Sequence, residues 1–191
     1  PHLGVILEEW GIDYCFYAEQ TLLKVCQIEG IDYDEVVAAL ERAGRTQPEK
    51  PPTVAPDYSR IRQQIPGVRA TLDRARQLHS PEHMRLANIA LGFDSLCSEL
   101  DDHMFQAEMF VLPWIGDGEG PDPWILELFA AGRRRMTFRV TCLRVLCNNF
   151  RAPSTYDPSL DRLYLELRRL EKTWVQQAYL EENLVVKGVA A

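Results

Sequence analysis

The sequence predicts an all-α protein, in which an up-down-up-down four-helix bundle follows a small helical N-terminal domain. Three observations predict this fold. Apolar residues recur at intervals of three and four along four long segments, which is the pattern of helices packed in a bundle. Short stretches rich in glycine and proline separate these segments, so neighbouring helices should run antiparallel. No segment alternates apolar and polar residues as a half-buried strand would.

The N-terminal residues 1–45 are expected to form a compact module of short helices, over about 3–10, 19–28 and 34–43. Cys15 falls at the turn between the first two helices, where a thiol can be exposed and reactive. We expect Cys15 and Cys26 to fill space in the core, and a reactive thiol at Cys15 is the alternative. Residues 46–57 contain four prolines, which cannot continue a helix and stiffen the chain. We interpret them as a linker between two domains.

The bundle is expected to occupy residues 58–191, with helices over about 58–79, 81–112, 124–149 and 158–187. Asp57 is placed to cap the first helix, and Pro66 should bend that helix or mark a late start. Ser80 followed by Pro81 is the signature of a second helix start. A loop rich in glycine precedes the third helix, and Asp157 caps the fourth.

Polar residues interrupt the apolar face of each long helix near one end of the bundle. They are Tyr58, His103, Arg133, Gln177 and Glu181. In an up-down bundle, the starts of the first and third helices share an end with the finishes of the second and fourth. Measured in turns, the five residues lie at similar distances from that end. We therefore expect their side chains to meet in one buried layer.

This layer is where helical bundles build di-iron sites from inward-facing histidine and glutamate side chains. Arg133 cannot ligate iron, because its guanidinium is permanently charged and has no lone pair to offer. We expect Arg133 to pair with Glu181, while the other three side chains complete the hydrogen bonds. A single metal ion held by His103 and Glu181, and an intact two-metal centre, are the alternatives.

The composition limits the partners and the compartment. A formal net charge of −7 disfavours nucleic acid, since phosphate binding requires a basic surface. No apolar run reaches the roughly 20 residues that span a bilayer, and no signal peptide is recognisable. The five cysteines have no CxxC spacing, which is typical of reduced thiols. We expect a cytoplasmic protein that binds neither nucleic acid nor membranes.

Several motifs occur in an order that is similar to a known family. They are GIDYC (Gly11–Cys15), HMFQAEMFVLP (His103–Pro113), NNF (Asn148–Phe150) and LEEN (Leu180–Asn183). They resemble the landmarks of the Repair of Iron Centres family, di-iron proteins linked to iron–sulfur cluster repair after nitrosative and oxidative stress. The resemblance implies a hemerythrin-like four-helix bundle behind a small helical domain.

The resemblance also indicates which family ligands have changed. The six iron-ligand positions fall at Tyr58, His103, Ala107, Arg133 (within one residue), Gln177 and Glu181. Only His103 and Glu181 keep the residue type that the family uses. The family's Cys-Cys-Gly-Gly motif is also reduced here to Cys15 followed by Phe, Tyr and Ala. The resemblance therefore implies the family fold with a degenerate metal site.

We expect a divergent paralogue of these repair proteins, with a non-catalytic accessory or regulatory role in metal-centre maturation or the stress response. No cofactor is expected. The alternative is a metal-binding protein with one or two iron ions, acting in iron donation, cluster repair or gas sensing. In that case Glu108 or Glu182, otherwise surface carboxylates, would complete the site with His103 and Glu181. A protein partner is expected, and a homodimer is one form it can take.

Overall fold

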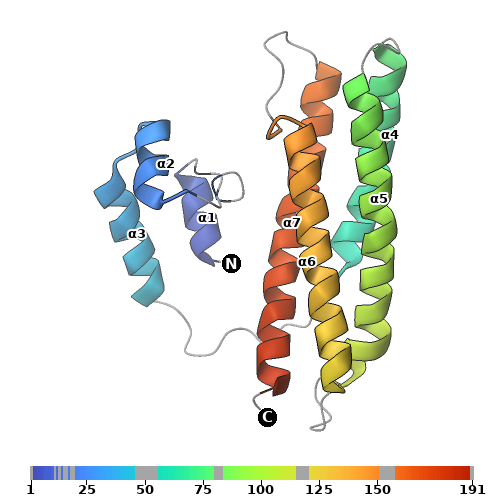
Figure 1. The fold of residues 1–191 in the computed structure, drawn as a ribbon. Coiled ribbons are helices and arrows are strands. Elements are labelled where there is room, and N and C mark those ends of the chain that lie inside the picture. Colours follow the sequence, from blue (N-terminus) through green and yellow to red (C-terminus); the bar gives the residue numbers. More distant parts are fainter. Residues whose placement is uncertain are drawn as a thin grey trace. The chain divides into compact units, whose positions relative to one another are not determined.

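A computed structural model describes most of the chain, namely residues 2–10, 12, 14, 17, 20–45, 56–79, 84–114, 121–150 and 158–189. Over these residues the protein is all-α and contains no strand, so the predicted fold class is confirmed. The chain divides into two compact units, Pro1–Thr53 and Val54–Ala191. Figure 1 shows the helices of each unit. None of the described helices is both long and apolar enough to cross a bilayer.

The first unit consists of α1 (His2–Glu9), α2 (Leu22–Glu29) and α3 (Tyr33–Arg45). Its core is formed by Ile12, Tyr17, Val25, Cys26 and Val36. Local capping explains the helix limits. The Thr21 hydroxyl accepts a hydrogen bond from the Lys24 N–H, and Gly30 ends α2 with a φ of 68°, which glycine adopts readily. Cys15 lies outside the described residues.

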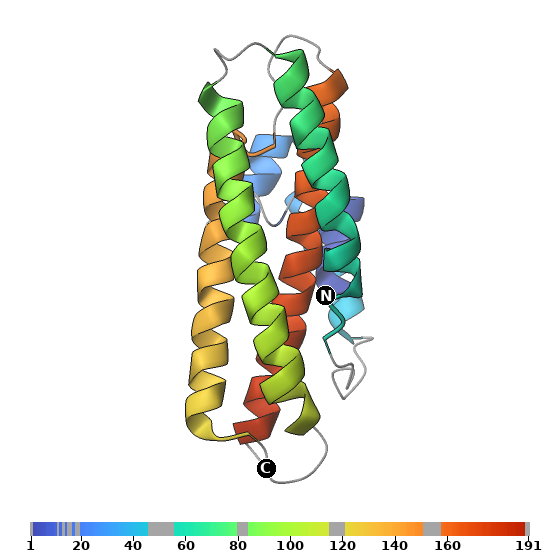
Figure 2. The ribbon, with the colours of Figure 1, turned by 90° about the vertical axis from the view of Figure 1, so that its right-hand side faces the viewer.

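The second unit is the four-helix bundle, which is built from α4 (Ser59–Leu78), α5 (Met84–Gln106), α6 (Pro123–Leu146) and α7 (Pro158–Val189). Consecutive helices run in opposite directions (Figure 2). The most extensive contacts join α4 to α7 and α5 to α6. Large side chains such as Phe93, Phe129 and Trp174 fill the space between the helices and are almost fully buried. Their burial provides the main driving force for this packing.

The bundle helices begin and end close to the predicted residues. The N-cap of α4 is Tyr58, one residue later than predicted, and its side chain makes no cap hydrogen bond. The Asp57 carboxylate accepts a hydrogen bond of 2.9 Å from the Ser59 N–H immediately before this helix. Pro66 lies within α4, on its exposed side, and the helix continues through it. The predicted caps at Ser80 and Asp157 lie outside the described residues.

Two helix ends differ from the prediction. α5 ends at Gln106 and continues as a π-helical turn, η1 (Ala107–Val111), and a 3-10 turn, η2 (Leu112–Trp114). α6 ends at Leu146 instead of near residue 149, because Asn148, Asn149 and Phe150 have φ values of 52°, 57° and 56°. A right-handed helix cannot continue through such left-handed residues.

Candidate functional site

The centre of the site is a carboxylate buried among three helices. Glu181 on α7 is 0% exposed. Its Oε1 accepts a hydrogen bond of 2.7 Å from the hydroxyl of Tyr58, the residue immediately before α4. Its Oε2 lies 3.0 Å from Nε2 of His103 on α5. We call Tyr58, His103 and Glu181 the central triad. They link three helices at the end of the bundle where the polar layer was expected.

Aromatic side chains surround the triad. The ring of Phe129 stacks on the ring of His103, with centroids 4.6 Å apart and planes inclined by 6°. Trp174 meets the same imidazole edge to face at 5.5 Å. These apolar surroundings strengthen the hydrogen bonds of the triad. They also make any buried polar atom that lacks a hydrogen-bond partner costly in free energy of folding.

The hydrogen-bond donors of the triad can be assigned from its chemistry. Burial, and then the negative charge of Glu181, raise the pKa of Tyr58 far above its usual range. Tyr58 therefore stays protonated and donates to Glu181, which accepts as a carboxylate. His103 Nε2 must then carry a hydrogen, because an unprotonated nitrogen and a carboxylate oxygen at 3.0 Å would repel each other. Both carboxylate oxygens of Glu181 are thus satisfied by donors within the protein.

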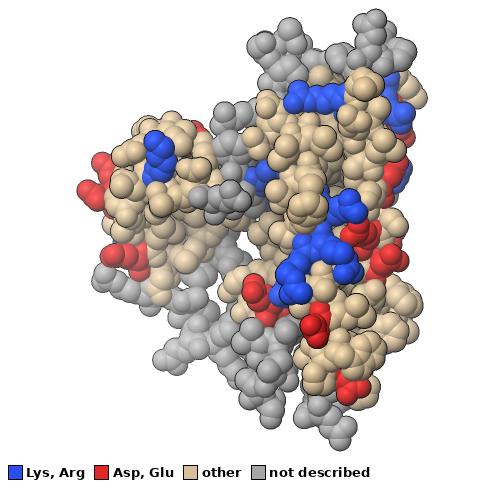
Figure 3. All heavy atoms as spheres, viewed as in Figure 1, with Lys and Arg blue, Asp and Glu red and all other residues tan. Residues whose placement is uncertain are grey.

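The partner of Glu181 differs from the expected one. Arg133 on α6 is half-buried and forms no ion pair with Glu181, whose two oxygens already bind Tyr58 and His103. Within the described part of the chain, Nη1 of Arg133 is buried without a hydrogen-bond partner. Because its side chain is half-buried, Arg133 lies at the boundary between core and surface. Figure 3 shows basic side chains gathered on the face where α6 and α7 lie.

The residue of α6 that faces the triad is Gly132, which sequence reasoning missed by one position. A Cβ atom added to Gly132 would lie 2.8 Å from Nδ1 of His103, so the imidazole occupies the place of a side chain. A glycine inside an otherwise regular helix was the available signal, since such a glycine often marks a close approach. Within the described residues, Nδ1 of His103 is buried and has no hydrogen-bond partner.

The remaining candidate residues take structural roles. Gln177 is buried, and its side-chain oxygen accepts a hydrogen bond of 3.1 Å from the Asp57 N–H, which fixes the start of α4. Glu108 lies on the surface and makes two hydrogen bonds, of 2.7 and 2.8 Å, to Arg62. This contact lowers the pKa of Glu108. Glu182 is exposed. Neither carboxylate is placed to complete a metal site with His103 and Glu181.

The residues at the family's ligand positions do not fit a di-iron centre. Ala107 is buried and offers no donor atom, and Arg133 carries a positive charge. His103 and Glu181 are residue types that can ligate a metal, but Nε2 of His103 and Oε2 of Glu181 already bind each other. Across the ranges that the structure describes, no three His, Cys, Asp or Glu side chains are grouped closely enough to hold a metal ion.

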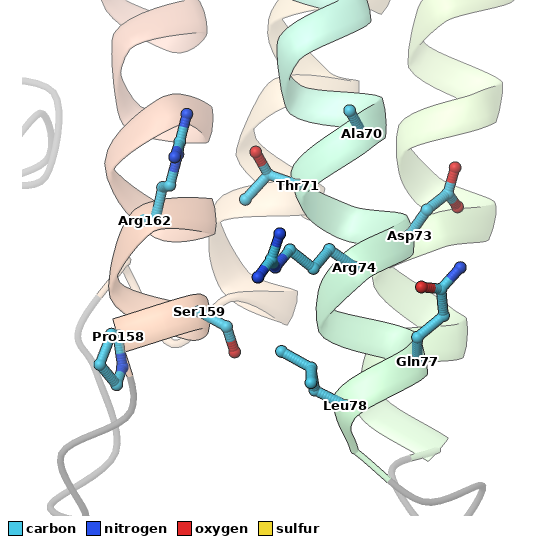
Figure 4. Close-up of a pocket in the computed structure, with 9 residues that line it drawn as sticks. All are labelled: Ala70, Thr71, Asp73, Arg74, Gln77, Leu78, Pro158, Ser159 and Arg162. Carbon is cyan, nitrogen blue, oxygen red and sulfur yellow. The ribbon is translucent and has the colours of Figure 1, made fainter.

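Hollows that are open to solvent occur in the described part of the bundle unit. One, of about 810 Å³, lies between α4 and α7 at the end opposite the triad. Figure 4 shows Arg74 reaching from α4 across this hollow toward α7. A second, of about 160 Å³, lies between η1 and α6 and is almost entirely apolar. The third, of about 220 Å³, lies between α5 and α6 beside His103 and Gly132.

Several large apolar side chains are exposed on the segments that form the second hollow, and three of them, Phe110, Trp124 and Leu128, line it. The full set, each between 44% and 63% exposed, is Phe105, Met109, Phe110, Trp114, Trp124 and Leu128. They come from the end of α5, the two short turns and the start of α6. A concentration of large apolar side chains on a surface is typical of a protein–protein contact. We call these six residues the apolar patch.

The fold and the site define a hemerythrin-like four-helix bundle whose centre is held by a hydrogen-bonded triad. No protein-family model matches the chain. The chain is similar to the iron–sulfur cluster repair protein YtfE of Yersinia pestis (strain Pestoides F) and to that of Yersinia pseudotuberculosis serotype O:1b (strain IP 31758). Each is 22% identical over an alignment that covers 97% of this chain and 90% of the relative. The chain is thus a divergent relative of the iron–sulfur cluster repair proteins, as its motifs indicated.

Proposed function

We propose that this protein is a non-catalytic accessory protein in iron–sulfur cluster repair, in which the central triad replaces the iron centre. The observation that carries the proposal is the complete pairing of Glu181. Its two oxygens bind Tyr58 and His103, at 2.7 and 3.0 Å, and leave no free carboxylate atom facing the centre. The low identity to the YtfE proteins agrees with a change of role within one fold.

In this proposal the triad lies in the layer where the resemblance places the family's iron ligands, and it joins helices across the core. Tyr58, His103 and Glu181 tie the starts and ends of α4, α5 and α7 together. A buried charge that is fully hydrogen-bonded is tolerated, and removing any one partner is costly. The bundle therefore keeps its shape without requiring a metal.

The apolar patch supports the expected protein partner. Its six large side chains would be covered in a complex, and aromatic residues contribute strongly at the centres of interfaces. In the proposed role the partner is another protein of cluster repair or maturation. A second copy of this chain is the alternative, and analytical ultracentrifugation distinguishes the two.

The proposal is tested in cells from which the gene has been removed. After exposure to nitric oxide, recovery of an iron–sulfur enzyme should be slow in these cells and normal when the wild-type gene is returned. A patch variant, Trp124→Ser, should fail to restore recovery. Phe138→Ser is the matched control, because Phe138 lies on the same helix outside the patch and is 65% exposed, against 63% for Trp124. Normal recovery without the gene, or with Trp124→Ser, would overturn the proposal.

The metal-binding alternative makes a different prediction. If one or two iron ions held the bundle together, a chelator would lower its melting temperature, since a ligand that binds only the folded state stabilises it. We expect the same melting temperature with and without EDTA.

A further inference from the structure

We propose that the apolar patch binds a basic segment of its partner, in which one large apolar side chain is flanked by lysine or arginine. The proposal rests on the protein partner of the proposed function and adds the chemistry by which that partner is recognised. Three features carry it. They are a hollow that admits an apolar side chain, carboxylates beside the exposed aromatic rings, and a sequence without basic residues in the segments that form this surface.

The hollow between η1 and α6 has room for one large apolar side chain. Its volume is about 160 Å³, and its walls are almost entirely apolar. Phe110 from η1 and Trp124 and Leu128 from α6 line it, and each of these side chains is between 45% and 63% exposed. Covering such apolar surface favours association. The side chain that enters the hollow is therefore apolar, such as leucine or phenylalanine.

Carboxylates stand next to the exposed rings of the patch. On α5, Asp101 and Asp102 precede Phe105 by four and three residues, so their side chains are its neighbours on the helix surface. On α6, Glu127 follows Trp124 by three residues and is its neighbour in the same way. All three carboxylates are exposed and form no ion pair within the described parts of the chain. They are available to basic side chains of a partner.

This part of the sequence has no basic residues. The segments 101–114 and 121–128 contain five Asp or Glu residues and no Lys or Arg, in a chain that has 21 Lys and Arg residues. One of the five, Glu108, is already paired with Arg62 of α4. The basic residues of α6 begin at Arg133. Figure 3 shows basic atoms higher on the face that it draws, whereas the charged atoms in view near the start of α6 are acidic. Charge complementarity therefore selects a basic partner.

The same charges disfavour two other occupants of the patch. In a two-fold dimer the identical surfaces of both copies would meet, so the carboxylates of one copy would face those of the other. The formal net charge of −7 on each copy adds to this repulsion. An anionic membrane surface would be repelled in the same way. A basic segment instead forms ion pairs at the rim of the contact while its apolar side chain is buried.

Fluorescence anisotropy of labelled peptides with the full chain tests the proposal. The probe is a synthetic peptide that carries one phenylalanine between two pairs of lysines. A second peptide has glutamate in place of every lysine, and a third has alanine in place of the phenylalanine. We expect the probe to bind at least about tenfold more tightly than the other two, and to bind less tightly as salt screens the charges. Equal binding of either other peptide, or no binding of the probe, overturns the proposal.

Variants of the chain locate the binding site. Trp124→Ser should weaken binding of the probe by about tenfold or more, as expected for a large aromatic side chain at the centre of an interface, and Phe138→Ser should bind like the wild type. Glu127→Gln should weaken binding by about two- to fivefold, the range expected for one exposed ion pair. Its control is Asp73→Asn, which removes an exposed carboxylate at the opposite end of the bundle. Equal affinities of a variant and its control overturn the proposal.

Sedimentation velocity of the chain alone examines the second copy as an occupant. A dimer that is lost in Trp124→Ser would place a second copy on the patch and overturn the proposal. Failure of the probe to bind, while recovery in cells still requires Trp124, would refute the basic partner and leave the proposed function standing. Binding of the probe together with normal recovery in cells that lack the gene would support the basic site and overturn the proposed function alone.

Discussion

Replacement of Tyr58 by phenylalanine tests the central triad with a minimal change in shape. The substitution removes one hydroxyl and leaves the aromatic ring in place. Tyr58 is 1% exposed, so water cannot replace the lost donor easily. Oε1 of Glu181 then loses the hydrogen bond of 2.7 Å and remains buried as part of a charged group.

The expected cost follows from the type of bond that is lost. A hydrogen bond to a charged group contributes about 1.5–3 kcal/mol, and an unsatisfied buried acceptor brings the loss toward the upper end. Removing a hydroxyl creates little empty volume, so the cavity contribution is small. We expect Tyr58→Phe to lower the free energy of unfolding by about 2–3 kcal/mol.

Urea unfolding followed by far-UV circular dichroism measures this loss. Tyr164→Phe is the matched control, because Tyr164 is also buried in the bundle and its hydroxyl has no hydrogen bond to a carboxylate in the described chain. In a Glu181→Gln background the effect of Tyr58→Phe should shrink, since the charge that Tyr58 stabilises is gone. If Tyr58→Phe costs no more than Tyr164→Phe, the hydrogen bond does not stabilise the bundle and the reasoning fails.

Three further predictions concern other parts of the bundle, and urea unfolding measures each of them. Gly132→Ala should lower the free energy of unfolding by about 1–3 kcal/mol, because the added methyl group overpacks the core beside His103. The control Gly67→Ala, which has open space around it, should leave this free energy unchanged or raise it by up to about 1 kcal/mol. Equal changes in the two variants would contradict the close approach at Gly132. Arg144→Met breaks the buried ion pair between Arg144 and Glu171, whose closest approach is 2.6 Å, and should lower the free energy of unfolding by about 3–5 kcal/mol. Adding Glu171→Leu should restore most of that stability, because no unpaired charge is then left buried. A double variant that loses the sum of the two single losses would refute this expectation. Burial raises the pKa of the Cys147 thiol from 9.0 to about 12. Above pH 9 the unfolded thiol ionises first, so stability should fall by up to about 1.4 kcal/mol per pH unit between pH 9 and pH 12, and Cys147→Ala should flatten that slope.

The periodicity of the sequence was sufficient to predict the bundle and the level of its polar layer. Residue spacing fixes the height of a side chain along a helix, and Tyr58, His103 and Glu181 do meet at one level. Spacing does not fix which atoms pair across the core, because each residue turns a helix by about 100°. The sequence therefore predicted Arg133 at the centre of the layer, whereas Gly132, one residue earlier on α6, lies against the imidazole and Arg133 lies at the edge of the core.

The π-helical turn was also beyond the reach of the sequence pattern. An extra residue in the turn Ala107–Val111 changes the direction of every later side chain on that segment. Glu108, within this turn, pairs with Arg62 on the surface. No rule of hydrophobic spacing signals such a turn in advance, since the apolar residues keep a helical pattern on either side of it.

The metal content of the purified protein tests the central claim most directly. Protein made without a histidine tag, in medium supplemented with iron and zinc, is measured by mass spectrometry beside His103→Ala. We expect a metal content near zero in both proteins, because Tyr58 and His103 already satisfy the carboxylate of Glu181. A wild-type content near one or two ions per chain that is lost in His103→Ala would contradict it, and would place a metal where the triad is described.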